Sequence, residues 1–158
     1  MSDEMTPEVP ESEVKEDHSP PTNIELPETD YVLSLMCQLA NLGLQQGVTI
    51  FVGGAIISGM IVSGRIYYED LANKLSNATI GGSGRPAYLD EVIDRYMDAA
   101  KDYDVPANPP EGWIMPEPSY IFLQNAKFSV NGSFTTQKGI FWRGRLSKVD
   151  GFIAGLTS

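Results

Sequence analysis

Four basic side chains lie in or beside one glycine-rich stretch near the C-terminus, GIFWRGRLSKVDGFIAG at residues 139–155. Arg143, Arg145 and Lys148 fall within this stretch, and Lys138 directly precedes it. Guanidinium and ammonium groups bind carboxylates and phosphates through charge-assisted hydrogen bonds. The spacing therefore predicts a surface patch that binds an anionic partner. Ordinary surface lysines and arginines are the alternative interpretation.

The residue types that catalyse reactions are sparse and poorly placed. His18 is the only histidine and lies in an acidic N-terminal segment, while Cys37, the only cysteine, lies on an apolar helix stripe. The adjacent carboxylates Glu69–Asp70 and those at 90–91 fall on predicted helices, where sequence neighbours do not face each other. The sequence contains no nucleophile elbow, phosphate-binding loop, dinucleotide fingerprint or Cys/His metal spacing. We therefore predict a protein that is not an enzyme and holds no metal or other cofactor.

The negative charge of the chain is concentrated at its N-terminus. Residues 1–30 contain ten acids and one base, which is −9 of the total net charge of −10. The same segment holds five of the eleven prolines and no aromatic residue. Such a composition cannot bury enough apolar surface to offset its ordering entropy. We predict a disordered acidic tail over residues 1–29 and a single folded domain over 30–158.

The sequence lacks the signals that direct a protein out of the cytoplasm or into a membrane. The N-terminus lacks the basic start and apolar run of a signal peptide. No stretch approaches the roughly 18 apolar residues that a membrane span requires. One cysteine excludes an internal disulfide. We expect a cytoplasmic protein with no membrane partner.

The first predicted helix, over 30–46, has two apolar stripes. Thr29 or Asp30 is a plausible N-cap and Gly47 a plausible stop. A helix at the end of a small domain usually has one apolar face. A second stripe therefore favours self-association through this helix, although a helix sunk deep into its own core explains the pattern equally well. The stripes are Val32, Leu35, Met36, Leu39 and Leu42, and, as the proposed self-association residues, Leu33, Cys37, Ala40 and Leu44.

The remaining chain alternates between strand and helix patterns. A strand over 48–52 and a Gly-Gly turn precede a long strand over 55–68, where Gly59 and Gly64 would permit bending. Two helices and a proline-rich connection follow, at 68–77, 86–103 and 104–118. Strand patterns return at 119–130, 139–146 and 150–156, with a bulge near Asn125, an Asn-Gly turn at 131–132 and a tight turn at 147–149.

This order predicts a fold of the α+β class that is mainly β. Five strands with a tight turn before the last are typical of SH3-like and Sm-like barrels. We therefore expect a five-stranded barrel with an N-terminal helix and a two-helix insertion, residues 67–118, between the second and third strands. This expectation is a fold-level analogy.

Several blocks resemble a narrower family. The stretches TIFVGGAIISGMIVSGRIYYEDL and YIFLQNAKFSVNGSFTTQKGIFWRGRLSKVDGFIAG resemble the gas vesicle accessory proteins of the U type (GvpU), and the similarity covers about 60 of the 158 residues. The features that carry it are the blocks ISGMIVSGRIYYEDL, LQNAKF and FWRGRLSKVDGF, in this order. The resemblance implies a non-enzymatic protein that accompanies gas vesicle shell proteins in the prokaryotic cytoplasm and influences how vesicles form or cluster. The expected partners are other copies of the chain and gas vesicle shell or accessory proteins.

An Sm-like RNA-binding protein is the alternative function. Residues 119–158 carry five bases and one acid, and Phe141 and Trp142 could stack on bases. Trp142, however, alternates with Arg143 on a strand and is expected to point into the core. The chain as a whole is strongly anionic, which opposes phosphate binding. We therefore expect no nucleic-acid partner, and we expect the acidic tail to contact Arg143, Arg145 and Lys148 through many weak ion pairs.

Overall fold

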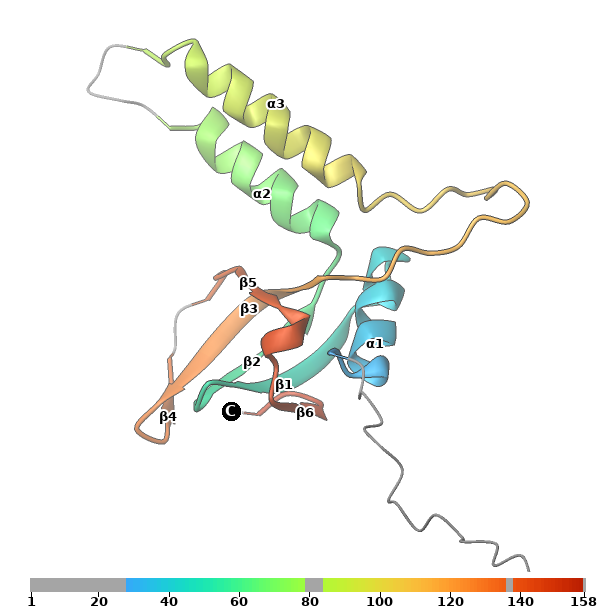
Figure 1. The fold of residues 1–158 in the computed structure, drawn as a ribbon. Helices are drawn as coiled ribbons and strands as arrows, with labels where there is room; N and C mark the ends of the chain where they lie inside the picture. Colours follow the sequence, from blue (N-terminus) through green and yellow to red (C-terminus); the bar gives the residue numbers. More distant parts are fainter. Residues whose placement is uncertain (1–27, 79–83, 136–137, 158) are drawn as a thin grey trace, which may run out of the picture.

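The computed structural model describes residues 28–78, 84–135 and 138–157. Within these residues, three helices and six strands follow one another in the order α1, β1, β2, α2, α3, β3, β4, β5 and β6, and a 3-10 turn, η1, precedes β6 (Figure 1). The predicted α+β class is confirmed, and two helices lie between the second and third strands as expected. The predicted acidic tail, apart from Glu28 and Thr29, lies outside the described residues.

Helix α1, Tyr31–Asn41, begins where the sequence predicted it. The Asp30 carboxylate caps the first turn by accepting hydrogen bonds from the backbone N–H groups of Val32 and Leu33, at 2.8 and 3.1 Å. This satisfies two of the donors that a helix start leaves without intrahelical partners. One side of the helix packs against the sheet and contributes four buried side chains, Leu33, Met36, Cys37 and Ala40.

The end of α1 differs from the prediction. Gly43 adopts a left-handed conformation with a φ of 94°, and the N–H of Leu44 donates to the carbonyl of Leu39 at 3.0 Å. This Schellman-type arrangement ends a helix. The predicted stop at Gly47 is wrong because Gly43 ends the helix earlier, so that Gly47 is already part of a strand.

Strands β1, Gln46–Val52, and β2, Ala55–Ile61, form the predicted hairpin. Their register pairs Val52 with Ala55, and Gly53 and Gly54 between them have φ values of 54° and 83°. A two-residue turn with positive φ at both positions matches the twist of the strands and favours glycine. Strand β6, Gly151–Ala154, pairs with the other edge of β1.

Strand β3, Tyr120–Val130, pairs with β2 and carries the predicted bulge. The register shifts between Ser58 and Met60, opposite Asn125, whose φ is 53°. An extra residue of this kind bends a strand and increases its twist. Two short strands share the other edge of β3. Strand β5, Trp142–Arg145, pairs with the first residues of β3. Strand β4, Ser133–Phe134, pairs with the last residues of β3 and follows them through the predicted turn at 131–132.

The sheet is not closed into the predicted SH3-like or Sm-like barrel. The pairings run β4-β3-β2-β1-β6, with β5 on the far edge of β3. A closed barrel requires every strand edge to be paired. Among the described residues no ladder joins β5 to β6, which are four residues each and are linked by η1, Leu146–Lys148. Strand β4 is a sixth strand that the sequence did not predict.

A buried polar cluster fixes the C-terminal segment to the β1–β2 hairpin. The Thr49 hydroxyl donates to the carbonyl of Gly155 at 3.0 Å, and the N–H of Thr157 donates to the Ser58 hydroxyl at 3.0 Å. Thr49 and Ser58 are also 3.1 Å apart through their hydroxyl oxygens, and both are almost fully buried. Buried hydroxyl groups need such partners, so the position of the last residues is set by the interior of the fold.

The predicted bent strand over 55–68 is wrong beyond Ile61. Helix α2, Gly64–Ser76, starts at this point, and the Ser63 hydroxyl accepts a hydrogen bond from the N–H of Arg65 at 3.1 Å. Gly64 permits close packing rather than bending, because a Cβ there would lie 2.5 Å from a ring carbon of Tyr103. The apolar alternation of the strand continues into the first helical turn, and this continuation explains the wrong prediction.

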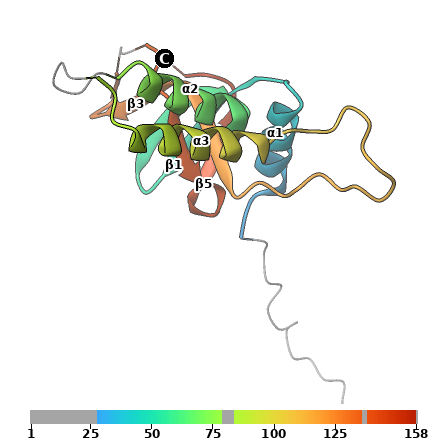
Figure 2. The ribbon, with the colours of Figure 1, turned by 90° about the horizontal axis from the view of Figure 1, so that it is seen from above.

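Helices α2 and α3, Tyr88–Lys101, pack against each other as a hairpin that projects from the sheet (Figure 1). Seen from above, the two helices lie side by side over the sheet (Figure 2). An aromatic cluster joins the base of the hairpin to β3. The ring of Phe122 lies 5.1 Å from that of Tyr67 and 5.2 Å from that of Tyr103, and Tyr68 lies 6.0 Å from Tyr103.

The proline-rich connection over 104–118 contains no helix or strand and returns from the hairpin past α1 (Figure 2). The side-chain amide of Gln38 donates to the carbonyl of Pro116 at 3.3 Å. The connection therefore borders the polar side of α1.

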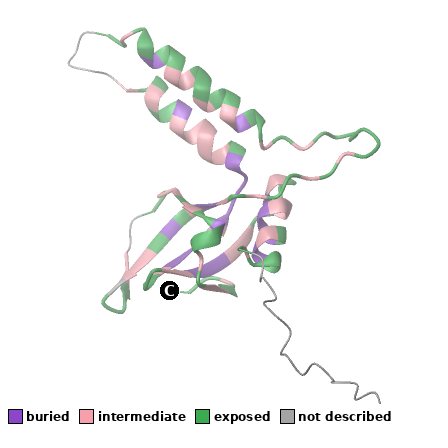
Figure 3. Ribbon diagram, viewed as in Figure 1, coloured by how far each residue is buried: buried purple, intermediate pink, exposed green. Residues whose placement is uncertain are grey.

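The core lies between α1 and the sheet (Figure 3). Five branched aliphatic side chains of the strands have no exposed surface, and the described part of the hairpin contributes only three buried apolar side chains. The strand residues are Val48, Ile50, Ile61, Ile121 and Leu123, and the hairpin residues are Ala72, Leu89 and Ala100.

Candidate interaction surfaces

Strand β5 separates an inward aromatic side chain from two outward arginines. The indole of Trp142 lies over Gly144, where an added Cβ would be 2.1 Å from a ring carbon, and packs against the core. Arg143 and Arg145 alternate with these residues and are exposed. The Trp-Arg-Gly-Arg sequence thus places both guanidinium groups on the solvent side of the strand.

Two of the four predicted patch residues, Arg143 and Arg145, meet at Tyr120, and Lys148 follows three residues after Arg145. The Arg143 guanidinium carbon lies 3.7 Å above the centre of the Tyr120 ring, a cation–π contact that orients it. Arg145 pairs through its backbone with Tyr120, and Lys148 is the exposed last residue of the turn η1. Within the described chain no carboxylate forms an ion pair with these three residues. We call Arg143, Arg145 and Lys148 the basic patch.

Lys138 lies apart from the basic patch. The N–H of its neighbour Gly139 donates to the side-chain oxygen of Asn125, at the bulge of β3, at 3.1 Å. The basic patch instead borders Tyr120, at the start of the same strand. The bulge and Tyr120 are separated by about 17 Å of extended chain, so one small partner does not contact all four cations.

The described chain begins beside the basic patch. Glu28 and Thr29 line a hollow of about 480 Å³ together with Glu117, Arg145 and Ser147. Glu28, the first described residue, therefore lies near an arginine of the patch. Coulomb attraction between exposed charges is strong only within about one Debye length, near 10 Å at 0.1 M salt.

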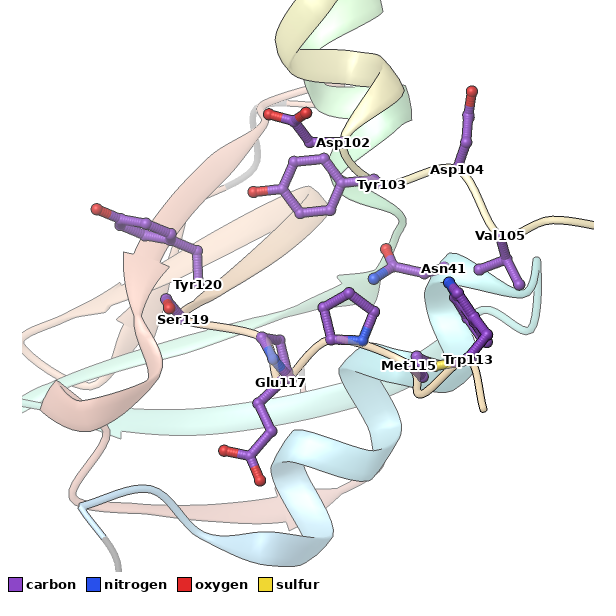
Figure 4. Close-up of a pocket in the computed structure, with 12 residues that line it drawn as sticks. Asn41, Asp102, Tyr103, Asp104, Val105, Trp113, Met115, Glu117, Ser119 and Tyr120 are labelled. Atoms are coloured by element: carbon purple, nitrogen blue, oxygen red, sulfur yellow. The ribbon is translucent and has the colours of Figure 1, made fainter. Parts of the chain in front are cut away.

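A second pocket, of about 240 Å³, lies between the proline-rich connection, the end of α3 and the start of β3 (Figure 4). The Tyr103 ring faces this space, and Trp113 and Met115 flank it with Asn41 of α1. Burial raises the pKa of the Tyr103 phenol, which keeps it neutral. The lining includes three acids and no base, so the pocket suits apolar or cationic groups rather than anions.

Sequence reasoning missed this pocket because three distant segments form it. The available signal was the combination of Trp113, Met115 and several prolines in a connection without helical or strand pattern. Such a connection must lie on other elements to bury its apolar side chains, but the sequence does not say which elements.

The predicted self-association residues fall into two groups. Leu33, Cys37 and Ala40 lie against the sheet of their own chain and are at most 5% exposed, so they are not presented to a second copy. Leu44 lies beyond the end of α1 and is 51% exposed. Self-association itself stays a prediction.

The Cys37 thiol and the carboxylates of Glu69 and Asp70 have structural roles in the fold. Burial raises the pKa of the Cys37 thiol to about 12, whereas a reactive cysteine needs a lowered pKa. The carboxylates of Glu69 and Asp70 pair with bases one helical turn away, Arg65 at 2.7 Å and Lys74 at 2.6 Å. These contacts are ion pairs along α2, and they do not bring two carboxylates together.

The described part of the chain contains no group of three or more His, Cys, Asp or Glu that could hold a metal ion. None of the helices in that part is long and apolar enough to cross a membrane.

Both aromatic residues considered for base stacking are engaged within the chain. Trp142 packs against the core, and the Phe141 ring lies 6.2 Å from that of Tyr67, with the Lys74 ammonium 5.6 Å from its centre. No observation on the structure favours the RNA-binding alternative.

No curated protein and no solved structure matches the chain. A family match, in contrast, covers almost all of the described residues. Over residues 30–157 the sequence matches the family described as gas vesicle protein GvpU-like. The match includes α1, the sheet, the α2–α3 hairpin and the basic patch, and the chain therefore belongs to the GvpU-like family of gas vesicle proteins.

Proposed function

We propose that this chain is a cytoplasmic, non-enzymatic accessory protein that modulates how gas vesicles assemble or cluster. It acts by associating with itself and with vesicle shell or other accessory proteins through weak electrostatic contacts. Family membership supplies the vesicle context. The observation that carries the mechanism is the exposed basic patch beside the point where the acidic N-terminal segment joins the fold.

The acidic segment and the basic patch have opposite charges. Residues 1–30 carry a net charge of −9, and the patch presents three cations without carboxylate partners among the described residues. We propose that the segment contacts the patch in the same molecule or in a neighbouring one. Contacts between molecules link vesicles, and contacts within one molecule compete with that linkage. Individual exposed pairs contribute little, so the number of pairs determines the strength.

Charge reversal in cells that make gas vesicles tests this function. Cells expressing the shell and accessory genes with Arg145→Glu/Lys148→Glu should show a clear change in vesicle clustering by electron microscopy. The control Arg95→Glu/Lys127→Glu changes the net charge equally at exposed positions on α3 and β3. Equal clustering with the wild type, the patch variant and the control would contradict the proposal.

Salt dependence tests the partner of the patch. With purified vesicles and protein, deletion of residues 1–27 should change clustering strongly at 0.05 M salt and little at 1 M, because the Debye length falls to about 3 Å at 1 M. The patch variant should behave like the deletion. A deletion that leaves both clustering and its salt dependence unchanged would show that another group binds the patch.

A further inference from the structure

The pocket of about 240 Å³ beside the proline-rich connection has a lining of two kinds (Figure 4). Tyr103, Trp113 and Met115 contribute two aromatic rings and a thioether, and Asp102 and Glu117 contribute carboxylates. No lysine, arginine or histidine of the described chain lines it. Aromatic faces and carboxylates both attract cations, and neither attracts anions. The lining therefore selects a positively charged group that also carries some apolar surface.

Two of the three carboxylates in this lining are not neutralised by a described residue. Asp104 pairs with Arg65. Asp102 and Glu117 are exposed and form no ion pair with another residue that the structure describes. The charge of Asp102 acts on the pocket wall, because it adds to the larger effect of burial in raising the pKa of Tyr103. A cation beside the Tyr103 ring would therefore lie in the field of this carboxylate.

One ring of the pocket lining already binds a cation of the same chain. Tyr120 lines the pocket, and the Arg143 guanidinium carbon lies 3.7 Å from the centre of its ring. A guanidinium group is planar and weakly hydrated, so it stacks readily on aromatic faces. Arg143 is not part of the pocket lining and leaves the space open. Its contact is direct evidence that the aromatic surface at this place accepts a guanidinium group.

The pocket adjoins two further hollows, which share different parts of its lining. One, of about 480 Å³, shares residues 117–120 with it and reaches Arg145. The other, of about 310 Å³, shares Asn41 and residues 103–105 and reaches Arg65 at the start of α2. Only the middle hollow has no arginine in its described lining. An extended chain segment can occupy all three hollows, whereas a free small cation fills only the middle one.

We propose that the middle pocket binds an arginine or lysine side chain carried by an extended segment of a partner protein. The apolar stem of this side chain lies along Trp113 and Met115, and its charged end lies beside Tyr103 and Asp102. The residues on either side of it occupy the two adjoining hollows. None of the basic-patch residues lines the middle pocket, and the inference does not rest on the proposed function.

A nuclear magnetic resonance titration of the full chain tests the site and the charge of its ligand. The probe is the peptide acetyl-Pro-Ala-Arg-Ala-Pro-amide, and the control peptide has neutral citrulline, which has nearly the same shape, in place of arginine. The arginine peptide should shift the indole N–H signal of Trp113 in a saturable way and leave that of Trp142, which packs against the core, unchanged. The citrulline peptide should bind at least about tenfold more weakly. Equal affinities, or no saturable shift at millimolar peptide, would overturn the proposal.

Neutralising the pocket carboxylates tests their role. Asp102→Asn/Glu117→Gln keeps the size of both exposed side chains and should weaken binding of the arginine peptide at least about tenfold, with an unchanged circular dichroism spectrum. The matched control is Glu91→Gln/Asp94→Asn, which removes the same charge at exposed positions of α3 outside the pocket and should bind the peptide like the wild type. Unchanged binding by the pocket variant, or an equal loss in both variants, would overturn the proposal.

A second ligand distinguishes a protein segment from a free small cation. Acetyl-arginine amide carries the same guanidinium group without neighbouring residues, so it should shift the Trp113 signal but bind much more weakly than the peptide. Equal affinity of the two ligands would show that the adjoining hollows contribute nothing, and it would overturn the extended segment as the occupant. These titrations contain no vesicles, so their failure leaves the proposed function as it stands, and unchanged clustering by the basic-patch variant leaves the pocket proposal as it stands.

Discussion

Different interactions stabilise the two regions of the molecule. One region is the sheet with α1, and the other is the α2–α3 hairpin. The sheet buries branched aliphatic side chains completely, and these come from strands far apart in the sequence. The hairpin buries mainly two alanines and a leucine between its helices, and it is joined to the sheet by aromatic rings at its base. The described ion pairs all involve the hairpin or its base, whereas the chain from Tyr31 to Gly64 is uncharged.

This difference has a consequence for dynamics. Opening the sheet exposes many aliphatic side chains at once, so it requires global unfolding. Opening the hairpin exposes few apolar atoms, and regions with little buried apolar surface open locally at a lower free energy. We therefore expect a rigid layer that carries the basic patch and the exposed apolar side of α1, and a hairpin that can move against it.

The largest expected effect is a deletion in the sheet core. Leu123 has no exposed surface, and Leu123→Ala should lower the free energy of unfolding by about 2–5 kcal/mol. Chemical denaturation followed by circular dichroism measures this loss. Ile153→Ala, at a half-exposed position of β6, is the control and should cost much less. Similar losses for both variants would show that the sheet interior is less tightly packed than the burial indicates.

The next effect is expected at the junction of the two regions. Gly64→Ala places a methyl group about 2.5 Å from the Tyr103 ring, and relieving this overlap should cost about 1–3 kcal/mol. Hydrogen exchange should become faster in α2 and α3 while the amides of β1 and β3 remain protected. Gly151→Ala is the matched control, since a Cβ there contacts nothing within 4 Å. Uniform loss of protection would mean that the hairpin and the sheet unfold together.

Local features of the fold were predictable from the sequence. The Gly-Gly turn at 53–54, the Asn-Gly turn at 131–132 and the bulge at Asn125 each depend on the conformational preference of one or two residues. The start of α2 was not predicted because apolar residues at 60–67 fit a strand and a helix equally well. The sequence could not show that the sheet stays open, because closure into a barrel depends on how far β5 and β6 extend.

The candidate surfaces were predictable to different degrees. Alternation along β5 correctly placed Arg143 and Arg145 outside, since side chains of a strand point alternately to its two faces. The sequence revealed two apolar stripes on α1 but could not say which one faces the sheet. The position of Lys138 could not be predicted either, because it depends on the path of the connection that leads to β5.

The stability of the sheet with α1 should depend on pH in the alkaline range, because one titratable group there, the thiol of Cys37, is buried. Burial raises the pKa of Cys37 from 9.0 to about 12, so the unfolded chain releases the thiol proton first. The stability that this group contributes is complete below pH 9 and is lost progressively as the pH rises from 9 towards 12. At pH 10 the loss should be on the order of 1 kcal/mol relative to pH 8. Cys37→Ala should flatten this part of the stability profile, and an unchanged slope would show that the thiol is not buried in solution.

The smallest effect is expected from the exposed ion pairs at the base of the hairpin. The Arg65 guanidinium donates to Glu69 at 2.7 Å and to Asp104 at 2.5 Å, and it thereby links the start of α2 to the chain that leaves α3. Both contacts raise the pKa of Arg65, so the guanidinium stays charged at any ordinary pH. The side chain is half exposed, and water and salt weaken such pairs. Arg65→Gln should therefore leave the unfolding midpoint of the sheet nearly unchanged.

The same variant should still alter the motion of the hairpin. Hydrogen exchange at the first turn of α2 should become faster in 0.05 M salt, and the difference from the wild type should disappear in 1 M salt because screening weakens the wild-type pairs. Lys101→Gln removes an exposed pair with Asp98 inside α3 alone, so it should not change exchange at the first turn of α2. If both variants alter exchange equally, the ion pairs stabilise the helices generally, and only the aromatic cluster fixes the hairpin to the sheet.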